Sequence, residues 1–176
     1  AAAALTDEGY TDVAIMEGGA PAWAEAGHTL YEGVNLPSKT FGELVEHELD
    51  TPRLSADDLA AMQEMGGDFI ILDGRTPEEY RRFNIPGGIS CPNAELPLRF
   101  NDLVTNAETT VVINCAGRTR SIIGAQTLIN FGVANQVFAL ENGTQGWALG
   151  DRELEYGAKR FPPNGIMAST LEKAGA

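Results

Sequence analysis

The sequence has 176 residues, of which 43% are apolar, and a formal net charge of −13. This length allows one packed core plus additional chain, and the apolar content is typical of a folded protein. The acidic balance argues against nucleic acid as a partner. No apolar run approaches the roughly 20 residues that span a bilayer. We therefore expect a folded protein that binds neither nucleic acid nor a membrane.

The first part of the chain, residues 1–33, resembles a later stretch of the same chain. Residues 13–17 correspond to residues 137–141, and the pattern Gly19-x-x-x-Trp23-Ala24 corresponds to Gly143-x-x-x-Trp147-Ala148. Leu5, Gly9, Leu30 and Gly33 likewise correspond to Leu128, Gly132, Leu154 and Gly157. This is an internal repeat. The first copy contains no strand, loop or cysteine before Leu5, so we expect residues 1–33 to be the C-terminal part of a preceding domain.

The next stretch, residues 34–51, is predicted to be a linker helix. Ser38 suits the N-cap position. Four apolar residues follow at helical spacing, namely Phe41, Leu44, Val45 and Leu49. Thr51-Pro52 then ends the helix, because the residue before a proline is disfavoured in helical geometry.

Residues 52–158 alternate between strand and helix signals, which predicts one complete α/β domain with a mostly parallel sheet. A helix is expected to begin at Ser55, which is followed by two acids in the first turn. The strands are predicted at residues 69–73, 89–91, 110–114 and 136–140, and the further helices at 77–83, 95–104 and 121–131. Residues 159–176 contain proline and glycine and are predicted to be a C-terminal linker or tail.

A cysteine occupies the turn between the strand at 110–114 and the helix at 121–131. The sequence there is Asn114-Cys115-Ala116-Gly117-Arg118-Thr119-Arg120-Ser121. A tight turn before a helix gathers backbone N–H groups and the positive end of the helix dipole around the sulfur. Arg118 and Arg120 add two positive charges. All these effects favour the thiolate, which is the nucleophilic form of cysteine.

Three blocks of the sequence resemble the rhodanese sulfurtransferase family. The loop at residues 115–120 resembles the active-site loop of that family. Residues 71–80, Ile-Leu-Asp-Gly-Arg-Thr-Pro-Glu-Glu-Tyr, and residues 85–89, Ile-Pro-Gly-Gly-Ile, resemble its Asp-x-Arg, Glu-aromatic and Ile-Pro-Gly-Ala series. Residues 141–147 resemble its Gly-Gly-x-x-x-Trp motif. The resemblance implies a three-layer α/β/α domain with a five-stranded, mostly parallel sheet, and a tandem protein in which residues 1–33 end a first rhodanese-like domain.

The resemblance also implies an activity. Cys115 would take sulfane sulfur from a small anionic donor such as thiosulfate and pass it, as a persulfide, to cyanide or a thiol acceptor. Arg120 and Arg118, with the loop residues Ala116, Gly117, Thr119 and Ser121, would bind the donor and the anionic persulfide. Asp73 and Arg75 would support the site, either directly or as a structural ion pair. No cofactor or metal is implied, and a reactive thiol suits a cytoplasmic location.

Several alternatives use the same residues. A sulfur carrier that delivers to a protein acceptor would need the same loop. A cysteine phosphatase or arsenate reductase has a related loop one residue longer, usually with histidine where Asn114 stands. A non-catalytic interaction module of the family usually lacks the cysteine. The region between Thr51 and Gly157 contains no histidine, so it cannot form a Cys–His dyad, and the spacing of the two cysteines and two histidines does not suit zinc. We read Cys91 as a core residue.

Overall fold

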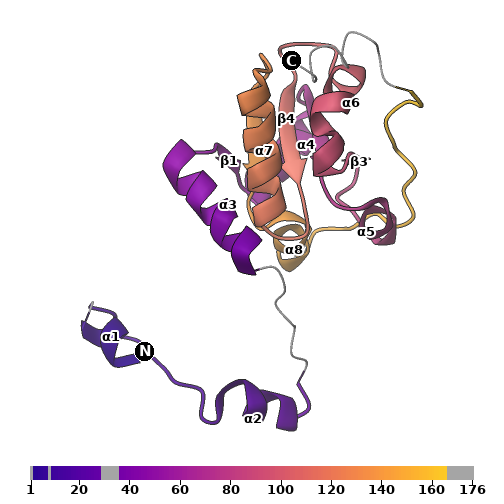
Figure 1. The fold of residues 1–176 in the computed structure, drawn as a ribbon. Coiled ribbons are helices and arrows are strands. Elements are labelled where there is room, and N and C mark those ends of the chain that lie inside the picture. The colour runs from indigo at the N-terminus through magenta and orange to yellow at the C-terminus, as the bar shows by residue number, and fades with distance from the viewer. Residues whose placement is uncertain (1, 8, 29–35, 166–176) are drawn as a thin grey trace. The chain divides into compact units, whose positions relative to one another are not determined.

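The structure is a computed structural model that describes residues 2–7, 9–28 and 36–165 (Figure 1). The chain divides into two units, Ala1–Leu36 and Pro37–Ala176. Among the described residues, no helix is both long enough and apolar enough to cross a membrane. The larger unit contains every strand of the described chain and also Cys115.

The larger unit is built on a five-stranded parallel sheet in the order β1-β5-β4-β2-β3. The strands are β1 Arg53–Leu54, β2 Phe69–Asp73, β3 Ile89–Ser90, β4 Thr110–Asn114 and β5 Val137–Leu140. All four pairings are parallel. The prediction of a five-stranded parallel sheet is confirmed. Strand β4 lies at the centre of this sheet, with β5 on one side and β2 on the other.

Helices cover both faces of the sheet, which gives the predicted three layers (Figure 1). On one face, α6 Leu96–Leu103 and α7 Thr119–Phe131 pack over alternate residues of β4, Val111 and Ile113. On the other face, α4 Ala56–Met65 and α8 Gly143–Leu149 pack over Val112. This alternation follows from the two-residue period of a strand. Because both faces are covered, β4 is an almost continuous apolar run.

Two short sequence signals start helices where they were expected. Ser55 caps α4, accepting from the Asp58 N–H at 3.0 Å, and the Asp58 side chain accepts from the Ser55 N–H. Thr76 caps α5 Pro77–Arg82 in the same reciprocal arrangement with Glu79. Each arrangement satisfies N–H groups that have no partner within the helix. A single 3-10 turn, η1 Asn93–Glu95, precedes α6.

The helix α3 Leu36–Leu49 begins earlier than predicted. Ser38 was expected to be its N-cap but is the third residue of the helix. The reason is Pro37, which fits the first helical turn because its missing N–H would have no partner there in any case. The buried side of α3 is narrow and includes Gly42, whereas Phe41 and Leu44 are more than half exposed.

The described part of the predicted C-terminal tail packs against the edge of the sheet at Arg160 and Phe161. The Ser90 N–H donates to the Arg160 carbonyl at 3.0 Å, and the Gly157 N–H donates to the Arg81 carbonyl at 2.7 Å. The Phe161 ring meets the Tyr80 ring edge-on, with centroids 5.8 Å apart. This segment therefore covers the open edge of β3, which would otherwise expose unpaired backbone groups. The remainder of the predicted tail, residues 166–176, lies outside the described residues.

The smaller unit contains two short helices, α1 Ala2–Asp7 and α2 Gly19–Glu25. None of its described side chains is buried, and Ile15 is 77% exposed. Residues 13–17, which match β5 in sequence, form no strand here. A lone strand has no neighbours for its backbone groups, which accounts for this difference. The matches predicted for Leu30 and Gly33 lie outside the described residues.

Candidate active site

Cys115 follows the last residue of the central strand β4. Its neighbour Asn114 pairs in register with Asp73 at the end of β2. Residues 115–118 turn the chain into α7, whose first residue is Thr119. The predicted site residues from Cys115 to Ser121 thus form one turn and the start of one helix. This is the carboxyl edge of a parallel sheet, where α/β folds place their binding sites.

The Cys115 sulfur is buried beside a hydroxyl group. The residue is 2% exposed, and its Sγ lies 3.3 Å from the Ser121 Oγ. Ser121 Oγ also approaches the Arg118 carbonyl at 2.9 Å and the Leu140 carbonyl at 3.2 Å. A hydroxyl carries one proton, so these acceptors compete with the sulfur for it. Either group can be the donor between the sulfur and Ser121 Oγ, and when the hydroxyl donates to a carbonyl its oxygen can accept from the thiol.

The loop rests on the start of α8. The Thr144 N–H donates to the Cys115 carbonyl at 2.8 Å, and the Gln145 N–H donates to the Ala116 carbonyl at 2.9 Å. Gly143 has φ +49°, and a Cβ there would lie 2.3 Å from the Cys115 carbonyl oxygen. A glycine is required at this point because any side chain would push the loop off its support. The Gly143 to Trp147 motif of the sequence thus forms the support of the cysteine loop.

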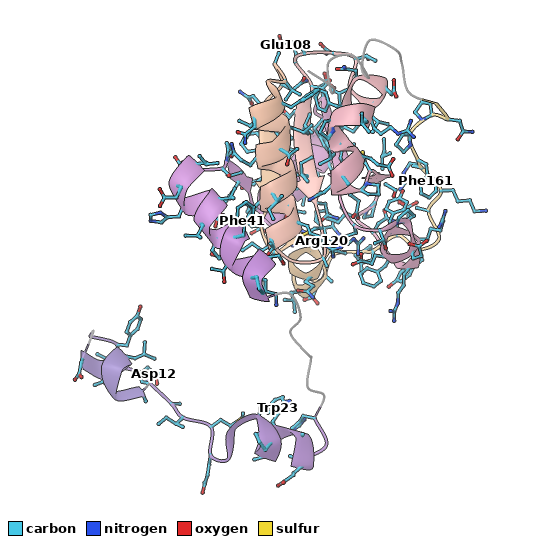
Figure 2. All side chains as sticks on the ribbon, in the orientation of Figure 1. Asp12, Trp23, Phe41, Glu108, Arg120 and Phe161 are labelled. Carbon is cyan, nitrogen blue, oxygen red and sulfur yellow. The ribbon has the colours of Figure 1, made fainter. Side chains whose placement is uncertain are left out.

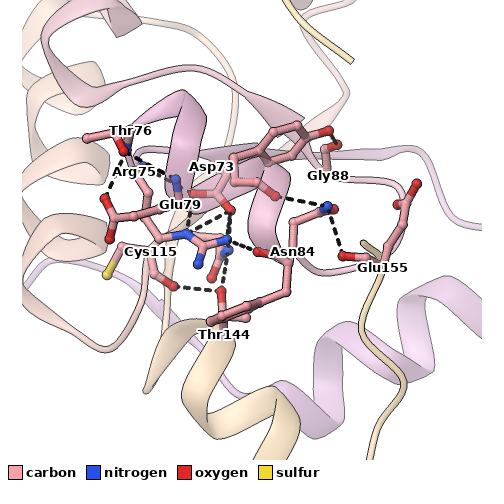
Figure 3. A network of polar contacts seen from close by, with 12 residues as sticks. Asp73, Arg75, Thr76, Glu79, Asn84, Gly88, Cys115, Thr144 and Glu155 are labelled. Carbon is pink, nitrogen blue, oxygen red and sulfur yellow. Dashed lines mark hydrogen bonds and ion pairs between the residues drawn. The ribbon is translucent and has the colours of Figure 1, made fainter. Parts of the chain in front are cut away.

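Asp73 and Arg75 form a buried ion pair beneath the strand ends (Figure 3). Each side chain is 1% exposed, and Arg75 Nη2 lies 2.7 Å from Asp73 Oδ2. Arg75 also donates to the Phe83 carbonyl at 2.7 Å. Asp73 accepts from Asn114 Nδ2 at 3.0 Å, and the same amide donates to Thr144 Oγ1 at 3.1 Å. Of the two roles considered from the sequence, these contacts match the structural ion pair.

The two loop arginines are both paired with carboxylates (Figure 2 labels Arg120). Arg120 makes a two-pronged contact with Glu79 of α5, with both N···O distances at 2.8 Å. Arg118 contacts Glu46 of α3 and also Glu43, the latter at 3.2 Å. The hydrogen bond that Arg120 donates to Glu79 raises the pKa of Arg120, and the one that Arg118 donates to Glu46 raises the pKa of Arg118. The positive charge predicted around Cys115 is therefore largely balanced within the described structure.

The pairing with Arg120 also shifts the pKa of the Glu79 carboxyl. Its hydrogen bond with Arg120 lowers the pKa of this carboxyl from 4.5 to about 2, against the opposing effect of partial burial. The unfolded chain therefore takes up a proton on Glu79 before the folded protein does as the pH falls. The contribution of Glu79 to stability is fully present above about pH 4.5 and is lost as the pH falls toward about 2.

This predicts a pH-dependent difference between the wild type and Glu79→Gln. We expect the wild type to be the more stable protein near neutral pH and this advantage to shrink steadily as the pH is lowered below about 4.5. Urea unfolding followed from about pH 6 to about pH 3 would measure it. Glu78→Gln, which removes an exposed acid one residue away, is the matched control. A stability difference that did not change with pH would contradict the assignment.

Sequence reasoning missed several residues that hold the loop. Asn114 and Thr144 connect it to Asp73, and Asn93 donates to the Arg120 carbonyl at 2.7 Å. Glu46 and Glu79 are the acids that pair with the arginines. The capping-box pattern Thr76-x-x-Glu79 is the signal in the sequence that could have drawn attention to Glu79. No pattern in the sequence marks Glu46 as a partner of the cysteine loop.

The second cysteine has a different environment. Cys91 is fully buried in the core beside Leu72 and Leu96, and burial raises the pKa of its thiol to about 12. A thiol of this kind is not a nucleophile near neutral pH. Its environment therefore matches the interpretation as a core residue. The part of the chain that the structure describes contains no group of three or more metal-ligating side chains.

The fold and the cysteine loop together define an α/β protein of the rhodanese kind. The model of the rhodanese-like domain matches residues 55–149, and the chain belongs to this family. The match falls inside the complete domain predicted at residues 52–158.

Three relatives illustrate the similarity. A crystal structure titled thiosulfate sulfurtransferase from Pseudomonas aeruginosa is 48% identical, with a TM-score of 0.78, and covers 98% of this chain and 33% of that one. SseB of Mycobacterium tuberculosis, which its name assigns provisionally to the thiosulfate sulfurtransferases, is 31% identical over 52% of this chain and 35% of SseB. A rhodanese-like domain protein from Staphylococcus aureus is 27% identical, with a TM-score of 0.53, over 61% of this chain and 100% of that one. The chain thus spans about a third of the length of the first two proteins.

Proposed function

We propose that this protein transfers sulfane sulfur through a persulfide on Cys115. The observation that carries the proposal is a single cysteine at the carboxyl end of the central strand, in a turn with four residues between it and Arg120. Gly143 and Thr144 at the start of α8 support this turn through the Cys115 carbonyl. Membership of the rhodanese-like family and the similarity to thiosulfate sulfurtransferases support the same chemistry.

The reaction has two steps. In the first, the Cys115 thiolate attacks the outer sulfur of a donor such as thiosulfate, a new S–S bond forms, and sulfite leaves with the electron pair of the broken S–S bond. In the second, cyanide or a thiolate attacks the outer sulfur of the persulfide, and the Cys115 thiolate is the leaving group. This is covalent catalysis in two half-reactions.

The loop residues have distinct proposed roles. Backbone N–H groups from Ala116 to Ser121, including those of Gly117 and Thr119, would stabilise the anionic persulfide. Arg120 and Arg118 would attract the anionic donor. Asp73 and Arg75 would act as positioning residues, since their contacts hold Asn114 and the strand end and do not reach the sulfur. No cofactor or metal takes part in this scheme.

The proposal is tested by a direct comparison of two reactions. We expect the protein to form thiocyanate from thiosulfate and cyanide, and to gain the mass of one sulfur atom when thiosulfate is added alone. We expect no hydrolysis of an aryl phosphate, because the turn is one residue shorter than that of cysteine phosphatases. Phosphate release without thiocyanate formation would replace the proposal with phosphatase chemistry. A persulfide without turnover to cyanide would favour the carrier that delivers sulfur to a protein acceptor.

We further propose that residues 1–33 end a preceding rhodanese-like domain and that residues 34–51 link it to the domain at 52–158. The first half of that preceding domain, from the same or another chain, would be the partner of residues 1–33. The similarity to the Pseudomonas aeruginosa structure extends over 98% of this chain, including the repeat. The nucleophilic thiol is the reason to propose a cytoplasmic location, where thiols stay reduced.

A further inference from the structure

Three arginines around the cysteine turn are each paired with a carboxylate in the described structure. Arg118 is held by Glu46 and Glu43 from α3. Arg120 is held by Glu79 from α5. Arg75 is buried against Asp73. An anionic donor that approaches the loop therefore meets arginines whose carboxylate partners are already in place, and it has to compete with them.

Glu79 is the strongest of these competitors. Both of its oxygens face Arg120, in the same two-pronged geometry that a sulfonate or carboxylate ligand would use. Its position is fixed independently, because Glu79 Oε2 also accepts from the Thr76 N–H at 3.1 Å at the start of α5. Both side chains are a little under 40% exposed, so the pair lies where solvent and ligands reach it. Figure 3 shows the Glu79 carboxylate on the Cys115 side of the network.

Arg120 itself is tied to the loop. Its carbonyl accepts from Asn93 Nδ2 at 2.7 Å, and it follows directly after the first residue of α7, so its backbone cannot move away. The Arg120 guanidinium therefore stays at the end of the cysteine turn, where it can pair either with Glu79 or with a ligand.

We propose that Glu79 is a specificity-determining residue that occupies the fork of Arg120 and selects against doubly charged sulfur donors. This inference rests on the sulfur-transfer function proposed above and narrows its substrate class. A dianion such as thiosulfate has to displace the Glu79 carboxylate and is repelled by it. A donor with a single charge, such as a thiol persulfide or a thiosulfonate, experiences less of this repulsion. The resting site therefore favours sulfur donors of low charge.

Two donors that differ by one charge test the proposal. Thiosulfate and methanethiosulfonate carry the same sulfane sulfur, but a methyl group replaces one anionic oxygen in the second. In Glu79→Gln we expect the KM for thiosulfate to fall about fivefold and that for methanethiosulfonate about twofold, the size expected for a partly exposed ion pair. We expect kcat to stay nearly constant, because the attacking sulfur and the leaving group are unchanged. High salt should reduce the difference between the variants.

Glu78→Gln is the control, since it removes the same charge from the neighbouring, exposed position of α5. It should leave both KM values nearly unchanged. Equal effects of the two variants would show a general charge effect and overturn the proposal. A higher KM for thiosulfate in Glu79→Gln would also overturn it, because Glu79 would then be orienting Arg120 for the donor.

A binding measurement separates this proposal from the proposed function. Sulfate, a dianion that cannot donate sulfur, should slow alkylation of Cys115 by iodoacetamide, and it should do so at about fivefold lower concentration in Glu79→Gln than in the wild type. This readout needs no turnover. Stronger protection in Glu79→Gln would support the role of Glu79 even if thiocyanate formation failed. Equal protection in the wild type and both variants would overturn it even if sulfur transfer were established.

Discussion

Replacing Cys115 with serine is expected to abolish sulfur transfer while leaving the fold intact. The substitution exchanges sulfur for oxygen in a side chain that is 2% exposed and already lies next to a hydroxyl group. A serine hydroxyl is a far weaker nucleophile near neutral pH and cannot carry a persulfide. We expect thiocyanate formation to fall at least about a thousandfold, as is typical when a covalent nucleophile is removed. The added sulfur mass should be absent after treatment with thiosulfate.

Cys91→Ala is the matched control for this experiment. Alanine is preferable to serine at this position, because a hydroxyl group would be buried in the apolar cluster around Leu72 and Leu96. The variant should lose some stability through the small cavity and keep most of its activity. Comparable losses of activity in both variants, with both still folded, would contradict the assignment of the nucleophile to Cys115.

The central part of the sheet could be predicted from the sequence because its signals are local. Phe69–Asp73 and Thr110–Asn114 are short runs of apolar, often β-branched residues, and the structure has strands with these same bounds. Such runs suit strands that are buried on both faces. Less regular segments were predicted with larger errors at their ends. The helix after Cys115 begins at Thr119, two residues before its predicted start.

The charges of the site could not be predicted, because they depend on tertiary contacts. Arg118 and Arg120 are close to Cys115 in sequence, which suggested two available positive charges. Their partners Glu46 and Glu79 lie on α3 and α5, and neither position is marked by spacing from the loop. The pairing of distant side chains follows from how the helices pack, and that packing is not encoded in a local pattern. The pairing of these arginines is the basis of the proposed preference for sulfur donors of lower charge.

Matching positions of the internal repeat share backbone geometry, although the described part of the smaller unit has no buried core. The residue before α2, Gly18, has φ +71°, and the residue before α8, Asn142, has φ +56°. Gly9 and Gly132 at the matching ends of α1 and α7 also have positive φ angles. Turns of this kind are determined by glycine and asparagine locally. The strand that should lie between them needs neighbours on both sides, as β5 has in β1 and β4. This pattern supports the proposal that residues 1–33 are part of a larger domain.

Replacing Arg75 with leucine is expected to produce the largest loss of stability among the residues around the site. The substitution leaves the Asp73 carboxylate 1% exposed without its charged partner, although the backbone N–H of residue 75 and Asn114 Nδ2 still donate to it. Breaking a buried ion pair from one side typically costs about 3–5 kcal/mol, because the remaining charge stays desolvated. For a domain of this size we expect the melting temperature to fall by roughly 10–20 °C.

Two further variants decide whether the uncompensated charge is the cause. Arg82→Leu removes an exposed arginine from α5 and should change the melting temperature by only a few degrees. Adding Asp73→Asn to Arg75→Leu removes the stranded charge and should recover part of the lost stability, because the Asn114 amide can still donate to the side-chain oxygen of the introduced asparagine. If Arg75→Leu were no worse than Arg82→Leu in urea and thermal unfolding, the pair would not be holding the strand ends. If the double variant were the least stable of all, the loss would come from the missing contacts with Phe83 and not from the charge.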